Sequence, residues 1–157
     1  MSVLELTQSN FDETISNNDI VIIDFWAPWC GPCLQFAPTF KEASEKIEGV
    51  TFAKVNTEEE QALGAQFGIR SIPTLMIFRE QIGIFSQPGS MTAKDLEDLL
   101  DKAKSIDMDE VRKELESQEW LYKKNSEYFF SLKPTKTLSL WIKTGLLISV
   151  GYLDTSS

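Results

Sequence analysis

Histidine is absent from this 157-residue chain, and cysteine occurs only twice, as Cys30 and Cys33. A single structural zinc site needs about four Cys or His ligands, so the chain by itself lacks the side chains for one. A secreted scaffold held by disulfides would need several bridges, and this pair can form only one. We therefore expect no metal or other cofactor, and a catalytic use of the pair.

Positive charge is also scarce, because 15 Lys and Arg residues stand against 24 Asp and Glu residues. A phosphate backbone is bound by concentrated Lys and Arg, so nucleic acid is excluded as the expected partner. The acidic excess lies in residues 1–103, whereas residues 120–153 carry five lysines and one glutamate. Length and composition are typical of one globular domain with an appendage.

The N-terminal segment has neither a basic region nor a long apolar run, the two marks of a secretory signal peptide. We therefore expect a cytoplasmic protein, in a compartment where resting thiols are kept reduced. There, a close cysteine pair is more often catalytic or metal-binding than structural.

Apolar periodicity and capping residues predict strands alternating with helices along the first 104 residues. Strands are expected at 3–6, 20–26, 51–56, 74–78 and 82–85. Helices are expected from a cap at Thr7 or Ser9 to about 17, at 31–47, at 58–67 with three leading glutamates, and after Thr92. This order predicts an α/β domain over residues 1–104, with residues 20–26 as a central strand buried on both faces.

The motif Trp29-Cys30-Gly31-Pro32-Cys33 lies where that buried strand passes into a helix. A helix N-terminus stabilises a thiolate, which is the nucleophile of disulfide exchange. We therefore expect Cys30, at the N-cap, to attack a substrate disulfide and Cys33, one turn on, to resolve the mixed disulfide. Pro32 in the first turn costs no helix hydrogen bond. The alternatives are half of a zinc ribbon and an incidental pair.

Asp24 interrupts the apolar strand, although aspartate is rare in strands. Burial of a carboxylate is costly unless it is paired or neutral, and desolvation should raise its pKa. We expect Asp24 to pass a proton to or from Cys33 during resolution. The alternative is an aspartate at the sheet edge that accepts from backbone donors. Lys54 is a candidate charge partner, with an ordinary surface lysine as the alternative.

Ile72-Pro73-Thr74 opens a predicted strand, where proline is tolerated because it cannot donate to the ladder. A cis bond before Pro73 would turn the preceding backbone towards a substrate strand. The residues alone leave the isomer open.

A family resemblance rests on these residues together. The chain resembles thioredoxin over roughly residues 1–104, in segment 26–33 and in Asp24, Pro38, Lys54, Ile72-Pro73-Thr74 and Gly89. The resemblance implies a thioredoxin fold, a central mixed sheet of five strands flanked by four helices. It implies a cis Pro73 against the cysteine pair, and an extended-substrate groove shaped by Trp29, Gly31, Pro32, Ile72, Pro73 and Gly89. It also implies Asp24 as the family's buried acid with Lys54 beside it, protein disulfides as substrates and an NADPH-dependent thioredoxin reductase as electron donor.

Two positions depart from the family pattern. The residue after the second cysteine is commonly basic in thioredoxins, but here it is Leu34. The turn before the last strand reads Glu80-Gln81 in place of an Asn-Gly-like pair. Leu34 exchanges a charge for an apolar contact beside the site, which puts partner choice in doubt.

The last third of the chain has no counterpart in a minimal thioredoxin. A helical extension is expected over 105–124, capped by Asp107, with an apolar stripe of Met108, Val111, Leu115 and Tyr122. Residues 125–157 form a basic, apolar tail whose run 138–153 is too short and too interrupted for a good membrane span. Contact with a membrane surface, folding back on the acidic domain, pairing with another copy, poor order and a shifted reading frame all remain open for this tail.

Three functions are compatible with this sequence. A cytoplasmic protein-disulfide reductase is favoured, because the Gly-Pro between the cysteines resembles reducing members of the superfamily. An oxidant or isomerase would use the same chemistry in an oxidising compartment. A binding module that docks on a larger assembly would need neither cysteine, since a fold alone does not determine function.

Overall fold

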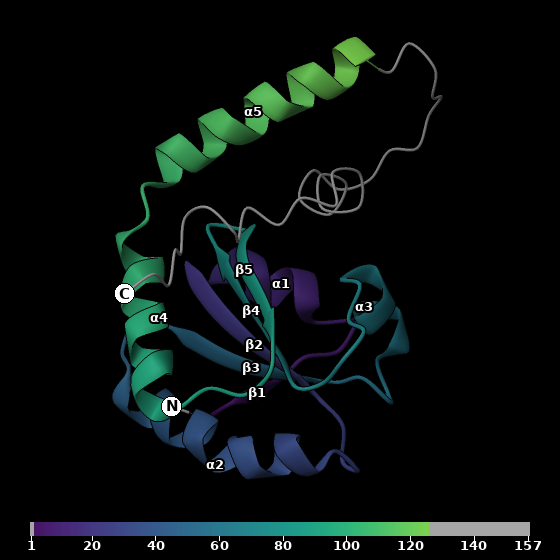
Figure 1. The fold of residues 1–157 in the computed structure, drawn as a ribbon, viewed down its shortest axis with the longest axis vertical. Helices are drawn as coiled ribbons and strands as arrows, with labels where there is room; N and C mark the ends of the chain where they lie inside the picture. Colours follow the sequence, from purple (N-terminus) through teal and green to yellow (C-terminus); the bar gives the residue numbers. More distant parts are fainter. Residues whose placement is uncertain (1, 126–157) are drawn as a thin grey trace.

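The structure is a computed structural model that describes residues 2–125, with side chains as far as residue 117 (Figure 1). It contains a five-stranded sheet with the order β1-β3-β2-β4-β5. The strands are β1 (Leu4–Glu5), β2 (Ile20–Trp26), β3 (Thr51–Asn56), β4 (Thr74–Arg79) and β5 (Ile82–Pro88). β1 and β2 pair in parallel with β3, and β4 runs antiparallel to both β2 and β5. The predicted mixed sheet of a thioredoxin fold is confirmed.

Five helices accompany the sheet: α1 (Phe11–Asn17), α2 (Gly31–Lys46), α3 (Gln61–Gln66), α4 (Ala93–Ser105) and α5 (Met108–Asn125). α2 and α4 cover one face of the sheet, and α1 and α3 cover the other. Consecutive strand residues point to opposite faces, so Ile22 packs in the α2 and α4 layer whereas Val21 and Ile23 pack in the α1 and α3 layer. β2 is buried on both faces, as expected.

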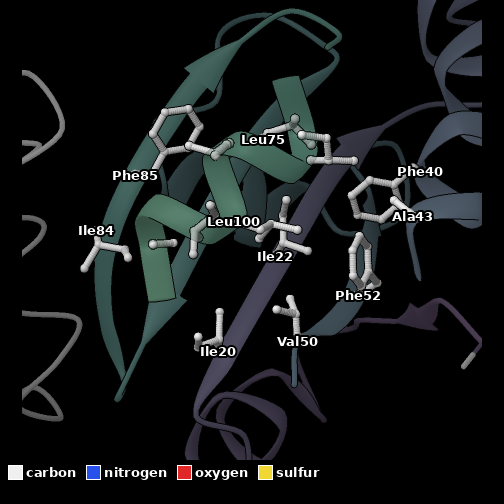
Figure 2. Packing of buried hydrophobic residues seen from close by; sticks show 14 of the residues in the cluster. Ile20, Ile22, Phe40, Ala43, Val50, Phe52, Leu75, Ile84, Phe85 and Leu100 are labelled. Carbon is white, nitrogen blue, oxygen red and sulfur yellow. The ribbon is translucent and has the colours of Figure 1, made fainter. Parts of the chain in front are cut away.

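The layer under α2 and α4 is a close aromatic and aliphatic core. Phe40 from α2 lies 5.1 Å from Phe52 of β3, ring centre to ring centre. Ile22 of the central strand and Leu100 of α4 are fully buried in the same cluster (Figure 2). This packing holds α2, and therefore the cysteine motif at its N-terminus, against the sheet.

Two helix starts differ from the sequence prediction. α1 begins after Asn10, so neither Thr7 nor Ser9 is its N-cap. The Asn10 side chain turns back to accept from the Thr7 N–H at 2.8 Å, and that local bond competes with capping. α3 begins at Gln61, so of the three glutamates expected in its first turn, Glu60 is the N-cap residue. Glu58 and Glu59 lie in the preceding turn, where Asn56 accepts from the Glu58 N–H.

Two other caps are as predicted. The Thr92 hydroxyl accepts from the Asp95 N–H at the start of α4, and the Asp107 carboxylate accepts from the Asp109 and Glu110 N–H groups at the start of α5. In both cases a side-chain oxygen satisfies N–H groups that have no partner within the helix.

The start of α5 is tied to the body of the domain. Met108 and Val111 are buried in the core cluster under α2 and α4. The Arg79 guanidinium donates to the Ala103 and Ile106 carbonyl oxygens at 2.8 and 2.7 Å, where α4 passes into α5. Leu115 of the predicted stripe packs partly against the same core, and the Tyr122 side chain lies outside the described residues.

The β4–β5 turn places Glu80 and Gln81 at φ of 49° and 68°. Both values are left-handed, as a two-residue hairpin turn of type I′ requires, and such turns favour Asn-Gly. Here the Glu80 carboxylate pairs with Arg112 of α5. A contact from outside the hairpin therefore accompanies this unusual turn sequence.

The interpretations made for residues 126–157 lie outside the described part of the chain. Among helices within residues 2–125, none is long and apolar enough to cross a membrane.

Candidate active site

The cysteine pair lies at the N-terminus of α2, at the end of the central strand. Cys30 is the N-cap residue, with extended dihedral angles, and Gly31 and Pro32 form the first turn. The Cys33 N–H donates to Cys30 Sγ at 3.3 Å. The two cysteines form a disulfide with their Cα atoms 5.3 Å apart. Opening this bond would leave Cys30 Sγ facing a free helix N–H, where a thiolate is stabilised.

The side chains around the pair differ sharply in exposure. Trp29 is 68% exposed, whereas Cys30 and Cys33 are 5% and 1% exposed. Cys30 is therefore the more accessible sulfur of a nearly covered pair.

The peptide bond between Ile72 and Pro73 is cis, as the resemblance implied. The Ile72 carbonyl oxygen lies 3.8 Å from Cys30 Sγ, and Ile72 packs against the pair. The Gly89 N–H donates to the Pro73 carbonyl at 2.8 Å, and Gly89 adopts φ of 107°, which suits glycine. Residues far apart in sequence thus meet at one side of Cys30.

Asp24 lies in the central strand, paired with Lys54 of β3 and Leu75 of β4. Its side chain is buried, and its Oδ1 atom has no hydrogen-bond partner among the described residues. Because β2 lies between β3 and β4, Asp24 is not at the sheet edge, and that part of the alternative is wrong. Burial raises the pKa of Asp24 from 3.8 to about 7, while the positive charge of Lys54 opposes that rise.

Lys54 is half-buried beside Asp24. Its ammonium nitrogen lies 4.9 Å from the ring centre of Trp26, a cation–π geometry. The same nitrogen lies 3.9 Å from the Glu5 carboxylate. The ammonium group is therefore placed by an aromatic ring and a carboxylate, unlike an ordinary surface lysine.

A hollow of about 460 Å³ opens on the α2 side of the pair. It is lined by Ser2, Val3, Asp24, Trp26, Cys33, Leu34, Ala37, Phe40, Lys41 and Lys54. Asp24 and Cys33 both line this hollow. Sequence reasoning did not find this hollow, although residues 34, 37 and 41 follow the spacing of one helix face.

Among the side chains described, those of residues 2–117, no group of three or more from His, Cys, Asp and Glu is placed to hold a metal ion.

A cysteine pair at a helix N-terminus, beside a cis proline on a mixed sheet, defines the class of thiol–disulfide oxidoreductases. The family model described as thioredoxin matches residues 2–102. The chain therefore belongs to the thioredoxin family.

Individual relatives agree with this assignment. The chain is 50% identical over 118 residues to a putative thioredoxin 2 of Streptomyces coelicolor, a match that covers 75% of this chain and 88% of the relative. It is 40% identical over 104 residues to a thioredoxin of Porphyra purpurea, covering 65% of this chain and 97% of that one.

Solved structures agree as well. A mutant thioredoxin from Halobacterium salinarum superposes with a TM-score of 0.63 at 31% identity, over 68% of this chain and 94% of that one. A Plasmodium falciparum thioredoxin gives a TM-score of 0.60 at 34% identity, over 64% of this chain and 98% of that one. The chain is a thiol–disulfide oxidoreductase that acts on protein disulfides.

Proposed function

We propose that the protein works as a reductant, with Cys30 as the attacking cysteine and Cys33 as the resolving one. The observation that carries this assignment is the N-cap position of Cys30, with the Cys33 N–H 3.3 Å from its sulfur. Cys30 is also the more exposed of the two. A thiolate at Cys30 is thus stabilised by the helix N-terminus and belongs to the less covered residue of the pair.

The reaction transfers two electrons. In the reduced protein, the Cys30 thiolate attacks one sulfur of a substrate disulfide, and the other substrate sulfur leaves as a thiolate. Cys33 then loses its proton and attacks Cys30 Sγ. This second step breaks the mixed disulfide, releases the reduced substrate and forms the Cys30–Cys33 disulfide, which is the oxidised state of the pair in the structure.

Asp24 is the proposed proton acceptor for Cys33. It lines the same hollow as Cys33, and its pKa of about 7 leaves a large fraction ionised near neutral pH. An acid–base group works best when its pKa lies near the working pH. Lys54 is the proposed pKa partner, because its positive charge keeps the pKa of Asp24 lower than burial alone would.

An extended substrate segment is proposed to lie across Trp29, Ile72, Pro73 and Gly89. The support is geometric, since the Ile72 carbonyl approaches Cys30 Sγ and Gly89 is bonded to Pro73. Backbone groups beside the reactive sulfur suit an extended peptide better than a compact surface.

The electron donor proposed from the family is an NADPH-dependent thioredoxin reductase, and the proposed compartment is the cytoplasm. Reduced thiols are maintained there, and a reductant of protein disulfides must itself be kept reduced. The proposed role of the protein in cell redox homeostasis is then to carry electrons from the reductase to protein disulfides.

The deciding experiment is the equilibrium reduction potential of the Cys30–Cys33 pair in the full chain, measured against a thiol–disulfide buffer. About 30 mV corresponds to a tenfold change in the equilibrium constant. A potential well below the glutathione poise supports the reductant. A potential near or above that of disulfide isomerases would assign the protein as an oxidant instead.

A trapping experiment tests the division of labour between the cysteines. The Cys33→Ser variant should accumulate a mixed disulfide between Cys30 and insulin, while Cys30→Ser should form none. Accumulation with Cys30→Ser alone would reverse the two roles.

A further inference from the structure

The hollow on the α2 side of the cysteine pair is larger than proton transfer between Asp24 and Cys33 requires. Its volume of about 460 Å³ falls within the range of ligand pockets. Much of its wall is apolar, from Val3, Ala37 and Phe40. The hollow can therefore accept an apolar group as well as water.

Leu34 stands at this hollow as an exposed apolar side chain. Only three large hydrophobic side chains are exposed in the described part of the chain, namely Leu4, Trp29 and Leu34 at 41%, 68% and 51%. Two of the three flank the cysteine pair in sequence. Scattered exposed leucines are ordinary, but one beside an apolar hollow and next to Cys33 forms a continuous apolar surface.

The hollow lies next to the cysteine pair at which a substrate must bind. Cys33 forms part of its wall, and Cys33 is bonded to Cys30, the proposed point of attack. A protein partner of standard size covers about 800 Å² of each surface. A footprint of that size around Cys30 is wide enough to include its exposed chain neighbours Trp29 and Leu34.

Charge indicates what flanks the occupant. The lining carries two ammonium groups, Lys41 and Lys54, and one buried carboxyl group, Asp24, in a chain with a net charge of −9. The Lys54 ammonium group also lies 3.9 Å from the Glu5 carboxylate, which leaves Lys41 as the less engaged of the two. A carboxylate on the partner would be attracted to these two ammonium groups and repelled by most of the remaining surface. Electrostatic complementarity of this kind sets orientation and selectivity more than raw affinity.

From these observations we propose that the hollow is a second substrate subsite. It takes an apolar side chain, flanked by a carboxylate, of the protein whose disulfide is exchanged. Leu34 is the residue that determines this specificity. The inference rests on the proposed attack by Cys30. It places a recognition element on the α2 side of the pair, in addition to the proposed groove at Ile72, Pro73 and Gly89.

The test uses the full chain and disulfide-linked peptides. Each peptide has Leu-Glu or Ser-Lys placed two or four residues before or after the reactive cysteine, and hydroxyethyl disulfide serves as a substrate too small to fill the hollow. At the placement that brings the dipeptide over the hollow, the Leu-Glu peptide should have a kcat/KM about tenfold higher than the Ser-Lys peptide, mainly through a lower KM.

Matched variants assign that preference to the hollow. Leu34→Gln should reduce the preference to less than twofold, whereas Leu34→Met should retain it. Leu4→Gln is the control, because Leu4 has similar exposure but does not line the hollow. The preference of each variant is expressed relative to its own rate with hydroxyethyl disulfide, and Leu4→Gln should keep the wild-type rate.

The outcomes separate the subsite from the proposed function. Loss of hydroxyethyl disulfide reduction by the wild-type protein would refute the function itself. Normal reduction with no Leu-Glu preference, or with a preference that survives Leu34→Gln, would overturn the subsite alone. A concentration-dependent dimer that Leu34→Gln dissociates would assign the hollow to a second copy of the chain and would also overturn the proposal.

Discussion

Replacing Asp24 with Asn should stabilise the oxidised protein in a pH-dependent way. The pKa of Asp24 is about 7 in the folded protein, against 3.8 for the ordinary carboxyl group. Each pKa unit corresponds to about 1.4 kcal/mol, so ionisation of this group costs the folded state about 4 kcal/mol at high pH. Asn has a similar shape and cannot ionise.

The pH window follows from the two pKa values. Below about pH 4 the carboxyl group is protonated in both states and contributes no difference. As the pH rises, the unfolded chain releases the proton first, so folding is progressively disfavoured until the folded group also ionises near pH 7. The advantage of Asp24→Asn over wild type should therefore grow from about pH 4 to pH 7 and then remain constant.

Urea unfolding of both oxidised proteins, followed by tryptophan fluorescence at pH 5, 6, 7 and 8, measures this advantage. Oxidation removes the cysteine titrations from the comparison. Asp101→Asn is the control, because it removes the same charge from an exposed position of α4. A difference between wild type and Asp24→Asn that stays constant from pH 5 to pH 8 would refute the argument.

Three further substitutions test the packing that supports the site. Val111→Ala should lower the free energy of unfolding by about 2 kcal/mol, since two buried methyl groups are lost from the core at the start of α5. Arg79→Met should cost about 1–3 kcal/mol, because the Ala103 and Ile106 carbonyls lose their donor. Thr92→Ala should cost about 1 kcal/mol through loss of the α4 cap. Urea denaturation at pH 7 measures all three.

Exposed substitutions serve as controls for these three. Leu4→Ala and Lys102→Met change similar side chains at exposed positions and should each stay within about 0.5 kcal/mol of wild type. Ser9→Ala should likewise have little effect, because Ser9 does not cap α1. A cost for Val111→Ala no greater than that for Leu4→Ala would mean that α5 adds nothing to the core.

Local patterns alone predicted the cysteine motif at a helix start and the burial of Asp24. The sequence shows an apolar run that Asp24 interrupts, followed by the two cysteines at a helix start. These features are predictable because each depends on residues that are neighbours in sequence. The caps at Thr92 and Asp107 were found in the same way, since a capping side chain reaches only two or three residues along the chain.

Local patterns failed where neighbouring polar groups compete. Thr7 and Ser9 are both acceptable caps, yet Asn10 is the N-cap of α1, and its side chain accepts from the Thr7 N–H. The glutamates before α3 suit a helix dipole, yet Asn56 holds that segment in a turn. The choice between such alternatives depends on contacts that propensity does not describe.

The sequence by itself therefore determined the order of the strands and helices, the reactive cysteine pair and the family. Only the tertiary structure decided the cis isomer at Pro73, the approach of Ile72 to Cys30, and the register that sets Asp24 opposite Lys54. The hollow beside Leu34 likewise exists only once β1, β2, β3 and α2 have packed together. The physical reason is that residues distant in sequence meet only through strand pairing and core packing, whose free energies belong to the whole domain.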